Sequence, residues 1–437
     1  MLFDKEELHR HCKTASQEAF LKRLKAYDEK MIPVMKARGY KCVQFSERTV
    51  AFVSVGEITF KRRRWKKGNH WRIPVDEALQ LPKHLRYSEE MMQVIAKSAL
   101  ILPYEKAAAY LRETYDISIS RSMVEKAVKW CAKLLKERED YRFYKEQNHQ
   151  KQTVPVIYVE GDGVFVKSKQ GTNQGRGIEL SHFVIHTGAY QKSKTRTVLQ
   201  NKHEIINLDN RIAREQVIDY IYNTYQITDE TILVTNSDGG RGYTPYVFKE
   251  MAKALKIKRH EHFWDAYHIK QTLKTTLAPY DNTLLEEALK AIKNHKKRQL
   301  KIVFDTAESL EKDDSKRDNL QKVNQTFFKN FHYTKPATSR GLTHQGVGVM
   351  ESQHRKVTYR TKRRGMYWTL DGISTISSLI LLADENKLED FFKGEWRKEY
   401  EKIKALDHLS ADSVRPTNQI PHQLPTAKHY LTAKKQY

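Results

Sequence analysis

The sequence predicts an α/β core that is interrupted by a block of helices and preceded by a mainly helical N-terminal region. Apolar, strand-like segments alternate with amphipathic helices from residue 153 to about 263. A charged stretch at about 270–340 has helical spacing instead, and the first 150 residues are mostly helical apart from a short β-hairpin. Because 437 residues exceed the usual size of a single core, we expect several packed units.

The charge balance favours a polyanionic partner. The chain has 78 Lys and Arg against 53 Asp and Glu, which gives a net charge of +25 and a pI near 9.6. Nucleic acid fits this charge, and so does a ribosomal, membrane-surface or heparin-type partner. With 39% hydrophobic residues the chain can still bury real cores. Charge alone therefore indicates the class of partner and not its identity.

Nothing in the sequence directs the chain to a membrane or out of the cell. The first residues, Met1 to Glu7, are charged where a signal peptide is apolar, and no run of about 18 apolar residues exists. The three cysteines, Cys12, Cys42 and Cys131, are too far apart for a zinc ribbon or a disulfide framework. We expect a cytoplasmic, nucleoid-associated bacterial protein without a membrane partner.

Residues 1–87 are predicted to hold one helix, up to about residue 40, and a β-hairpin. Strand-like runs at 49–55 and 58–60 meet at a turn of Gly56 and Glu57, and the second run leads into a basic segment around Trp65. This segment could clamp phosphates, although a solvated basic loop is the alternative. Its candidate DNA contacts are Arg62, Arg63 and Arg64.

Residues 88–150 are predicted to form three short helices and a linker helix. Ser88 and Ser120 can cap the first and the third helix. The third helix has one apolar stripe from Val124 to Cys131, which predicts burial of that face. A helix-turn-helix domain would present the opposite face to DNA, whereas dimerisation or packing is the alternative role. The candidate DNA contacts on that face are Arg121, Ser122, Lys126 and Lys129.

Residues 151–385 are predicted to form the α/β domain, with the helical insertion at about 270–340. The expected strands lie at 154–159, 178–186, 195–199, 231–235 and 256–263, and the expected helices at 210–225 and 244–255. Residues 386–437 are expected to form a C-terminal helix and an irregular tail, because three prolines interrupt the last segment.

Two aspartates carry the main chemical signal. Asp162 and Asp238 each follow an apolar strand and are flanked by glycine. The carboxyl ends of strands are where ligands gather in α/β sheets, and glycine lets phosphate approach the backbone. Two carboxylates at such ends suit a hard cation such as Mg²⁺ or Mn²⁺. Each Asp-Gly pair alone is also an ordinary turn.

A third acid, Glu351, stands alone in a cationic segment. At a helix start its carboxylate could face inward, whereas an ion pair with Arg355 is the alternative. Asp371 is a rival, although Asp371 and Gly372 resemble a turn. The cations that could meet phosphate are Arg355, Arg360, Lys362, Arg363 and Arg364.

Two further positions are auxiliary candidates. Asp265 and His268 lie on one helix face and could contact DNA or orient the metal site, or they form a structural contact only. Glu160 lies on the same strand face as Asp162 and could support it.

Taken in order, these motifs resemble the DDE transposases of ISLre-type bacterial insertion sequences, which are relatives of the mutator-like group. The motifs are Glu160-Gly-Asp-Gly, Ser237-Asp-Gly, Asp265-x-x-His268 and Glu351-Ser-x-His-Arg, and the resemblance covers roughly residues 45–380. It implies a ribonuclease-H-like fold with a helical insertion before the last acid. It also implies a metal-binding catalytic triad of Asp162, Asp238 and Glu351.

This resemblance leads to the hypothesis of two-metal phosphoryl transfer on DNA. Two Mg²⁺ or Mn²⁺ ions would support cleavage at the terminal inverted repeats and attack of the freed 3'-hydroxyl on target DNA. The three helices of residues 88–133 would find the repeats, and a homo-oligomer assembled on DNA is expected. A non-transposing metal-dependent nuclease and a DNA-binding regulator, in which the acids are turn and cap residues, are the rival functions.

Overall fold

The computed structural model describes residues 4–81, 83–145, 150–168, 177–194, 196–342, 348–362 and 364–413. It contains two compact units, residues 1–388 and residues 389–437. Helices and sheets are both abundant, so the predicted mixed α/β class is confirmed. Over the described ranges, every helix is too short or too polar to span a lipid bilayer.

The N-terminal segment of the first unit is a long helix packed on a small antiparallel sheet. Asp4 caps the helix, and apolar side chains of the sheet such as Phe52 pack against Phe20. The hairpin is confirmed, but its strands are longer than predicted and its turn lies at residues 53–55. The elements are α1 (Lys5–Ala37), β1 (Lys41–Phe52), β2 (Gly56–Lys67), β3 (His70–Arg72) and α2 (Pro74–Ala78).

Three helices follow, as predicted. Ser88 caps the first by accepting a hydrogen bond from Met91, and Ser120 accepts one from Met123. The expected third helix and linker helix form one continuous helix, because no glycine or proline interrupts the helical spacing. The predicted apolar stripe is buried. The helices are α3 (Glu89–Ile101), α4 (Tyr104–Tyr115) and α5 (Arg121–Lys145).

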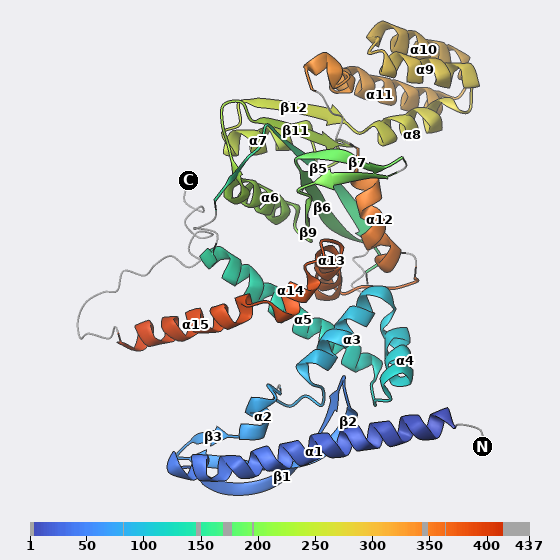
Figure 1. Ribbon diagram of the computed structural model, residues 1–437. Coiled ribbons are helices and arrows are strands. Elements are labelled where there is room, and N and C mark those ends of the chain that lie inside the picture. The colour runs from blue at the N-terminus through green and yellow to red at the C-terminus, as the bar shows by residue number, and fades with distance from the viewer. Residues whose placement is uncertain are drawn as a thin grey trace. The chain divides into compact units, whose positions relative to one another are not determined.

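A five-stranded sheet forms the centre of the first unit (Figure 1). Its spatial order is β12-β11-β5-β6-β9. Strand β5 pairs antiparallel with β6, and β6 with β9, whereas β11 is parallel to both β5 and β12. The strands are β5 (Val156–Val166), β6 (Ile178–His186), β9 (His203–Asn207), β11 (Ile232–Ser237) and β12 (Arg259–Trp264).

Helices cover both faces of this sheet. On one face α6 (Asn210–Thr224) and α7 (Pro245–Ala254) pack on an apolar layer that includes Val159 and Phe183. On the other face α12 (Met350–Thr361) contacts β5 and β6, and α13 (Leu370–Asp384) contacts β9. The predicted helices at 210–225 and 244–255 are thus confirmed to within a residue of their observed ends.

Two predicted strand features differ from the structure. The strand expected at 195–199 exists as β8 (Arg196–Gln200), but it pairs with β7 (Gly188–Ser193) in a separate hairpin. The third strand of the central sheet is β9, which the sequence pattern did not reveal because its five residues include only two apolar side chains. A small parallel pair, β4 (Gln152–Thr153) and β10 (Tyr225–Gln226), completes the described strands.

The helical insertion is confirmed as a bundle with a core of its own. Leu273, Ala288, Phe304 and Phe327 share that core. The elements are α8 (Ala266–Leu277), α9 (Asn282–Lys293), α10 (Lys297–Leu310), α11 (Asp314–Asn330) and the 3₁₀ turns η2 (Phe331–Thr334) and η3 (Thr338–Arg340).

The second unit contains most of α14 (Leu388–Lys393) and all of α15 (Trp396–Ser413). Its aromatic side chains Phe391, Phe392 and Trp396 are buried. The expected C-terminal helix is present, and the expected irregular tail lies outside the described residues from 414 onward.

Candidate active site at the ends of two parallel strands

The pairing of β5 with β11 brings the two predicted aspartates together. The last pair of this parallel ladder joins Glu160 to Asn236. Asp162, within β5, and Asp238, directly after β11, each lie two residues beyond that pair, and neighbouring strands are typically about 4.8 Å apart. Asp162 lies inside β5 and not after it, because β5 continues along β6 where β11 has already ended. Both aspartates therefore lie at one end of the parallel ladder.

The carboxylate of Asp162 is in an environment that disfavours its charge. Its pKa is raised to about 6, chiefly by burial and further by the charges of Asp238 and Asp265, against the opposing effects of a hydrogen bond from the Gly163 amide and of His268. The side chain is 21% exposed. Accumulated negative charge in a half-buried carboxylate group fits binding of a hard cation.

Asp265 and His268 form a hydrogen-bonded structural contact, which was one of the two roles predicted for them. Asp265 caps α8, and its Oδ1 atom accepts hydrogen bonds from the backbone amide and the ring Nδ1 of His268. Burial would raise the pKa of Asp265, but these hydrogen bonds hold it below its ordinary value. The hydrogen bond to Asp265 raises the pKa of His268, and the negative charges of Asp162 and Asp238 add to that rise. The pair is thus electrostatically linked to the aspartates.

Glu160 connects the strand of Asp162 to the start of α12. Its side chain is fully buried, and Oε2 accepts hydrogen bonds from the backbone amides of Gly348 at 2.8 Å and Val349 at 2.9 Å. The same oxygen accepts from the amide of Asn236, which also donates to Asp265. The Oε1 atom has no hydrogen-bond partner. Glu160 therefore anchors the helix that carries Glu351.

Glu351 lies in the first turn of α12 with an exposed side chain. Three residues later on the same helix, His354 is buried, and its Nδ1 atom lies 3.7 Å from Oδ2 of Asp162. Among the residues that the structure describes, no group of three or more His, Cys, Asp or Glu side chains is arranged to hold a metal ion. The structure thus brings Asp162 and Asp238 together. Glu351 lies one helical turn before His354, which is the residue of α12 that faces Asp162.

A buried polar chain extends from His354 across the sheet. The rings of His354 and His182 stack with centroids 5.0 Å apart, and Nε2 of His182 lies 2.9 Å from Glu204. Burial would raise the pKa of Glu204, but His182 and the lysines beside it hold this pKa at about 2. Burial also lowers the pKa of His354 to about 3, so its ring is neutral at pH 7.

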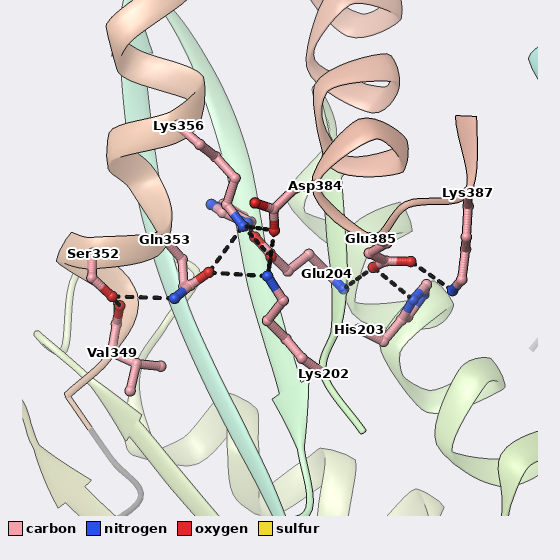
Figure 2. A network of polar contacts seen from close by, with 11 residues as sticks. Lys202, His203, Glu204, Val349, Ser352, Gln353, Lys356, Asp384, Glu385 and Lys387 are labelled. Atoms are coloured by element: carbon pink, nitrogen blue, oxygen red, sulfur yellow. Dashed lines mark hydrogen bonds and ion pairs between the residues drawn. The ribbon is translucent and has the colours of Figure 1, made fainter. Parts of the chain in front are cut away.

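At Glu204 this series of buried polar side chains joins an ion-pair network (Figure 2). Lys202 and Lys356 both contact Glu204 and Asp384, so that β9, α12 and α13 are joined by alternating charges. Gln353 hydrogen bonds to both lysines. No sequence pattern predicts this network, because its members are scattered along the chain and none belongs to a recognisable motif.

The three arginines of the predicted phosphate clamp have different surroundings. Arg62 is buried and contacts Asp76, and Arg63 pairs with the buried Asp28, so neither lies in a solvated loop, which was the alternative to the phosphate clamp. The physical reason is that the basic run continues strand β2, which puts Arg62 on the face of the buried residues Ile58 and Phe60 and Arg63 on the opposite face, against Asp28 of α1. Arg64 lies over the exposed ring of Trp71, with its guanidinium carbon 4.9 Å from the ring centroid.

The cations of α5 and α12 also divide into exposed and buried groups. Arg121, Ser122, Lys126 and Lys129 are exposed on one face of α5, although Lys129 pairs with Glu125. Arg355 and Lys362 are exposed, Arg364 is half-buried, and Arg363 lies outside the described residues.

Arg360 is the exception, since it is 2% exposed. It donates hydrogen bonds to the backbone carbonyls of Ala99 and Leu102 in the N-terminal helices, and its guanidinium lies over Trp368. Its place is therefore structural and differs from the expected phosphate contact. Asp371, the rival third acid, is exposed in the first turn of α13 and not in the turn that its glycine neighbour had indicated.

Comparisons with known proteins place the chain in a family. The UPF0236 protein in the vanSb 3' region of Streptococcus gallolyticus is 27% identical over 375 residues, which cover 85% of this chain and 80% of that protein. Among solved structures, the Drosophila P element transposase strand transfer complex matches 81% of this chain and 93% of its own, with 9% identity and a TM-score of 0.25. A model of the Uncharacterised protein family (UPF0236) matches residues 3–399, so this chain belongs to the UPF0236 family.

Proposed function

We propose that this protein is a DDE-type DNA transposase that cleaves and joins DNA strands with divalent metal ions. The observation that carries the proposal is the position of Asp162 and Asp238, which lie equally far beyond the last pair of two adjacent parallel strands. Burial, with a smaller contribution from the charge of Asp238, raises the pKa of Asp162. The strand order, with three antiparallel strands and two parallel strands added beside the first, agrees with a ribonuclease-H-like core.

Asp162 and Asp238 would hold Mg²⁺ or Mn²⁺, and Glu351 would complete the ligand set. When bound, a pair of such ions activates the attacking oxygen and stabilises the leaving oxygen of the phosphodiester. The Oδ1 atom of Asp162 accepts a hydrogen bond from the backbone amide of Gly163, and its Oδ2 atom lies 3.7 Å from Nδ1 of His354. Asp238 is similarly oriented by the amide of Gly240, which donates to its Oδ1 atom at 2.8 Å.

The role of the surrounding residues follows from their contacts. Glu160 fixes the start of α12 and thereby the distance between Glu351 and the strand ends. Asp265 and His268 hold the beginning of α8 beside the aspartates. Groups that orient metal ligands in this way commonly change activity about 10–100-fold when removed. We therefore treat Glu160, Asp265 and His268 as positioning residues.

DNA binding would use the exposed cations. The polar face of α5 would enter a groove as in a helix-turn-helix, and Arg64 with Trp71 would hold phosphate and stack. Arg355 lies on the helix that carries Glu351, and Lys362 is the residue that follows the C-terminal end of that helix, so both add positive charge to this element. Two element ends must meet in one complex, so a homo-oligomer on DNA is part of the proposal.

The test is cleavage of a plasmid that carries the DNA flanking this gene, in Mg²⁺ or Mn²⁺. The wild type is compared with Asp238→Ala and with Asp305→Ala, which removes an exposed acid of α10 as a matched control. We expect metal-dependent nicks at the repeat ends and joining to target DNA in the wild type and the control only. Cleavage without joining would favour a nuclease, and binding of the ends without any cleavage would favour a regulator.

A further inference from the structure

A pocket lies at the β12 edge of the central sheet, on the side of α7. Asn236 faces Glu160 and Asp265, so the preceding residue, Thr235, faces the α7 side. There β12, α7 and the 3₁₀ turns η2 and η3 line an open pocket of about 580 Å³. Figure 1 shows α7 beside β11 and β12 at this edge of the sheet. Pockets of this size hold small organic ligands.

Positive charge dominates the lining of this pocket. It contains four lysines and Arg340 against a single carboxylate, Glu261, and that carboxylate already contacts Arg259 and Arg340. Two of the lysines are paired outside the pocket, with Glu250 and Asp229. The other two, Lys249 and Lys335, have no acidic partner within the described part of the chain. These two cations are available for an anionic ligand.

Two histidines form the polar floor of the pocket. The hydroxyl of Thr235 lies 2.8 Å from Nε2 of His260 and 2.8 Å from Nδ1 of His262. Burial lowers the pKa of His260 to about 4 and that of His262 to about 3, so both rings are neutral at pH 7. The hydroxyl has one proton, so it donates to one ring and accepts from the other.

The shared hydroxyl fixes what the two rings offer to a ligand. The ring that accepts from Thr235 carries its own proton on the other nitrogen, and the ring that donates to Thr235 keeps a lone pair there. The second nitrogens of the two rings are therefore one hydrogen-bond donor and one acceptor, on residues that line the same pocket as the two unpaired lysines. A nucleobase edge or a sugar hydroxyl can satisfy both, and a phosphate can satisfy the lysines.

We propose that this pocket binds a nucleoside monophosphate unit, with its phosphate on Lys249 and Lys335 and its polar edge on His260 and His262. The unit is either a free nucleotide or the 5'-phosphorylated end of a DNA strand, because both carry the same groups. The site is separate from the aspartates and does not depend on the proposed catalysis.

The test measures binding of deoxyadenosine monophosphate, deoxyadenosine and inorganic phosphate to the full chain by calorimetry in the absence of metal. A double variant, Lys249→Ala with Lys335→Ala, is compared with a matched control, Lys290→Ala with Lys301→Ala, which removes two exposed lysines of α9 and α10. We expect the nucleotide to bind more tightly than either part. The pocket variant should bind it about tenfold more weakly or worse, because charge-assisted hydrogen bonds are lost, while the control should match the wild type.

A second variant tests the imidazole pair. Thr235→Val removes the bridging hydroxyl at similar volume and should weaken the nucleotide while leaving phosphate affinity unchanged. Displacement of a labelled nucleotide by a 5'-phosphorylated oligonucleotide, but not by the unphosphorylated strand, would assign the pocket to strand ends. Displacement by free nucleotide alone would assign it to a soluble ligand. Equal binding of phosphate and nucleotide, or equal loss in the pocket and control variants, overturns the proposal.

Discussion

Replacing Asp162 with Asn should stabilise the metal-free protein at neutral pH. The folded protein holds the pKa of Asp162 at about 6, whereas the ordinary value is 3.8. An acid with a raised folded-state pKa binds its proton more tightly in the folded than in the unfolded chain. Its contribution to stability is therefore most favourable below pH 4 and declines as the pH rises through 6.

The size of the effect follows from that difference in pKa. The ionised carboxylate costs about 3 kcal/mol of folding free energy above pH 7 if the whole difference is realised. Asn keeps the shape and can still accept the hydrogen bond from Gly163, which Oδ1 of Asp162 accepts at 2.7 Å. We expect Asp162→Asn to raise the free energy of unfolding by about 1–3 kcal/mol at pH 7.5 and to leave it nearly unchanged at pH 4.

Urea denaturation in a chelator, at pH 7.5 and pH 4, measures this difference. Asp305→Asn is the control, because Asp305 is exposed on α10 in the helical insertion. Adding Mn²⁺ should then stabilise the wild type more than Asp162→Asn, because a ligand that binds the folded state stabilises it. A variant that is less stable than the wild type at pH 7.5 would refute the idea that negative charge has accumulated at this strand end.

Three other substitutions test the packing and the anchoring of the site. Arg360→Met should lower the free energy of unfolding by about 3 kcal/mol in denaturant titration, since one buried and one part-buried carbonyl lose their donors, and an unchanged midpoint would exclude the structural role. Gly161→Ala should cost about 1–3 kcal/mol in the same assay, because a Cβ atom there would lie 2.5 Å from the ring of Phe183; no loss would contradict this close approach. Glu160→Gln should slow single-turnover DNA cleavage about 10–100-fold with little change in stability, because it removes the charge that holds the amides of α12, and an undiminished rate would show that this anchor is dispensable.

The sequence predicted those parts of the fold whose causes are local. Caps such as Ser88 and the apolar stripe of α5 lie where the residue pattern indicated, because capping and helical burial depend on residues only a few positions apart. The strand preceding Asp238 was recognisable from its apolar run. The alternation of strands and helices then implied the class of the fold and the neighbourhood of Asp162 and Asp238.

Features that depend on distant partners were not predictable in this way. Arg62 and Arg360 belong to charge runs, which normally face solvent. Both side chains are nonetheless buried, where Arg62 pairs with Asp76 and Arg360 donates a hydrogen bond to a backbone carbonyl of α3. The polar chain from His354 through His182 to Glu204 joins three elements that lie far apart in the sequence. Such contacts can be predicted only when the order of the strands in the sheet is known, and a single sequence does not reveal that order.

Mn²⁺ binding, measured by the loss of the free-ion signal in electron paramagnetic resonance, shows directly whether Asp162, Asp238 and Glu351 hold metal ions. Wild type, Asp162→Asn, Asp238→Asn, Glu351→Gln and the control Asp305→Asn are titrated side by side at pH 7.5, with and without DNA carrying the repeat ends. We expect bound Mn²⁺ in the wild type and the control, and clearly weaker Mn²⁺ binding when any of the three proposed ligands is replaced. Equal Mn²⁺ binding in all five proteins, or none in the wild type with DNA present, would contradict it.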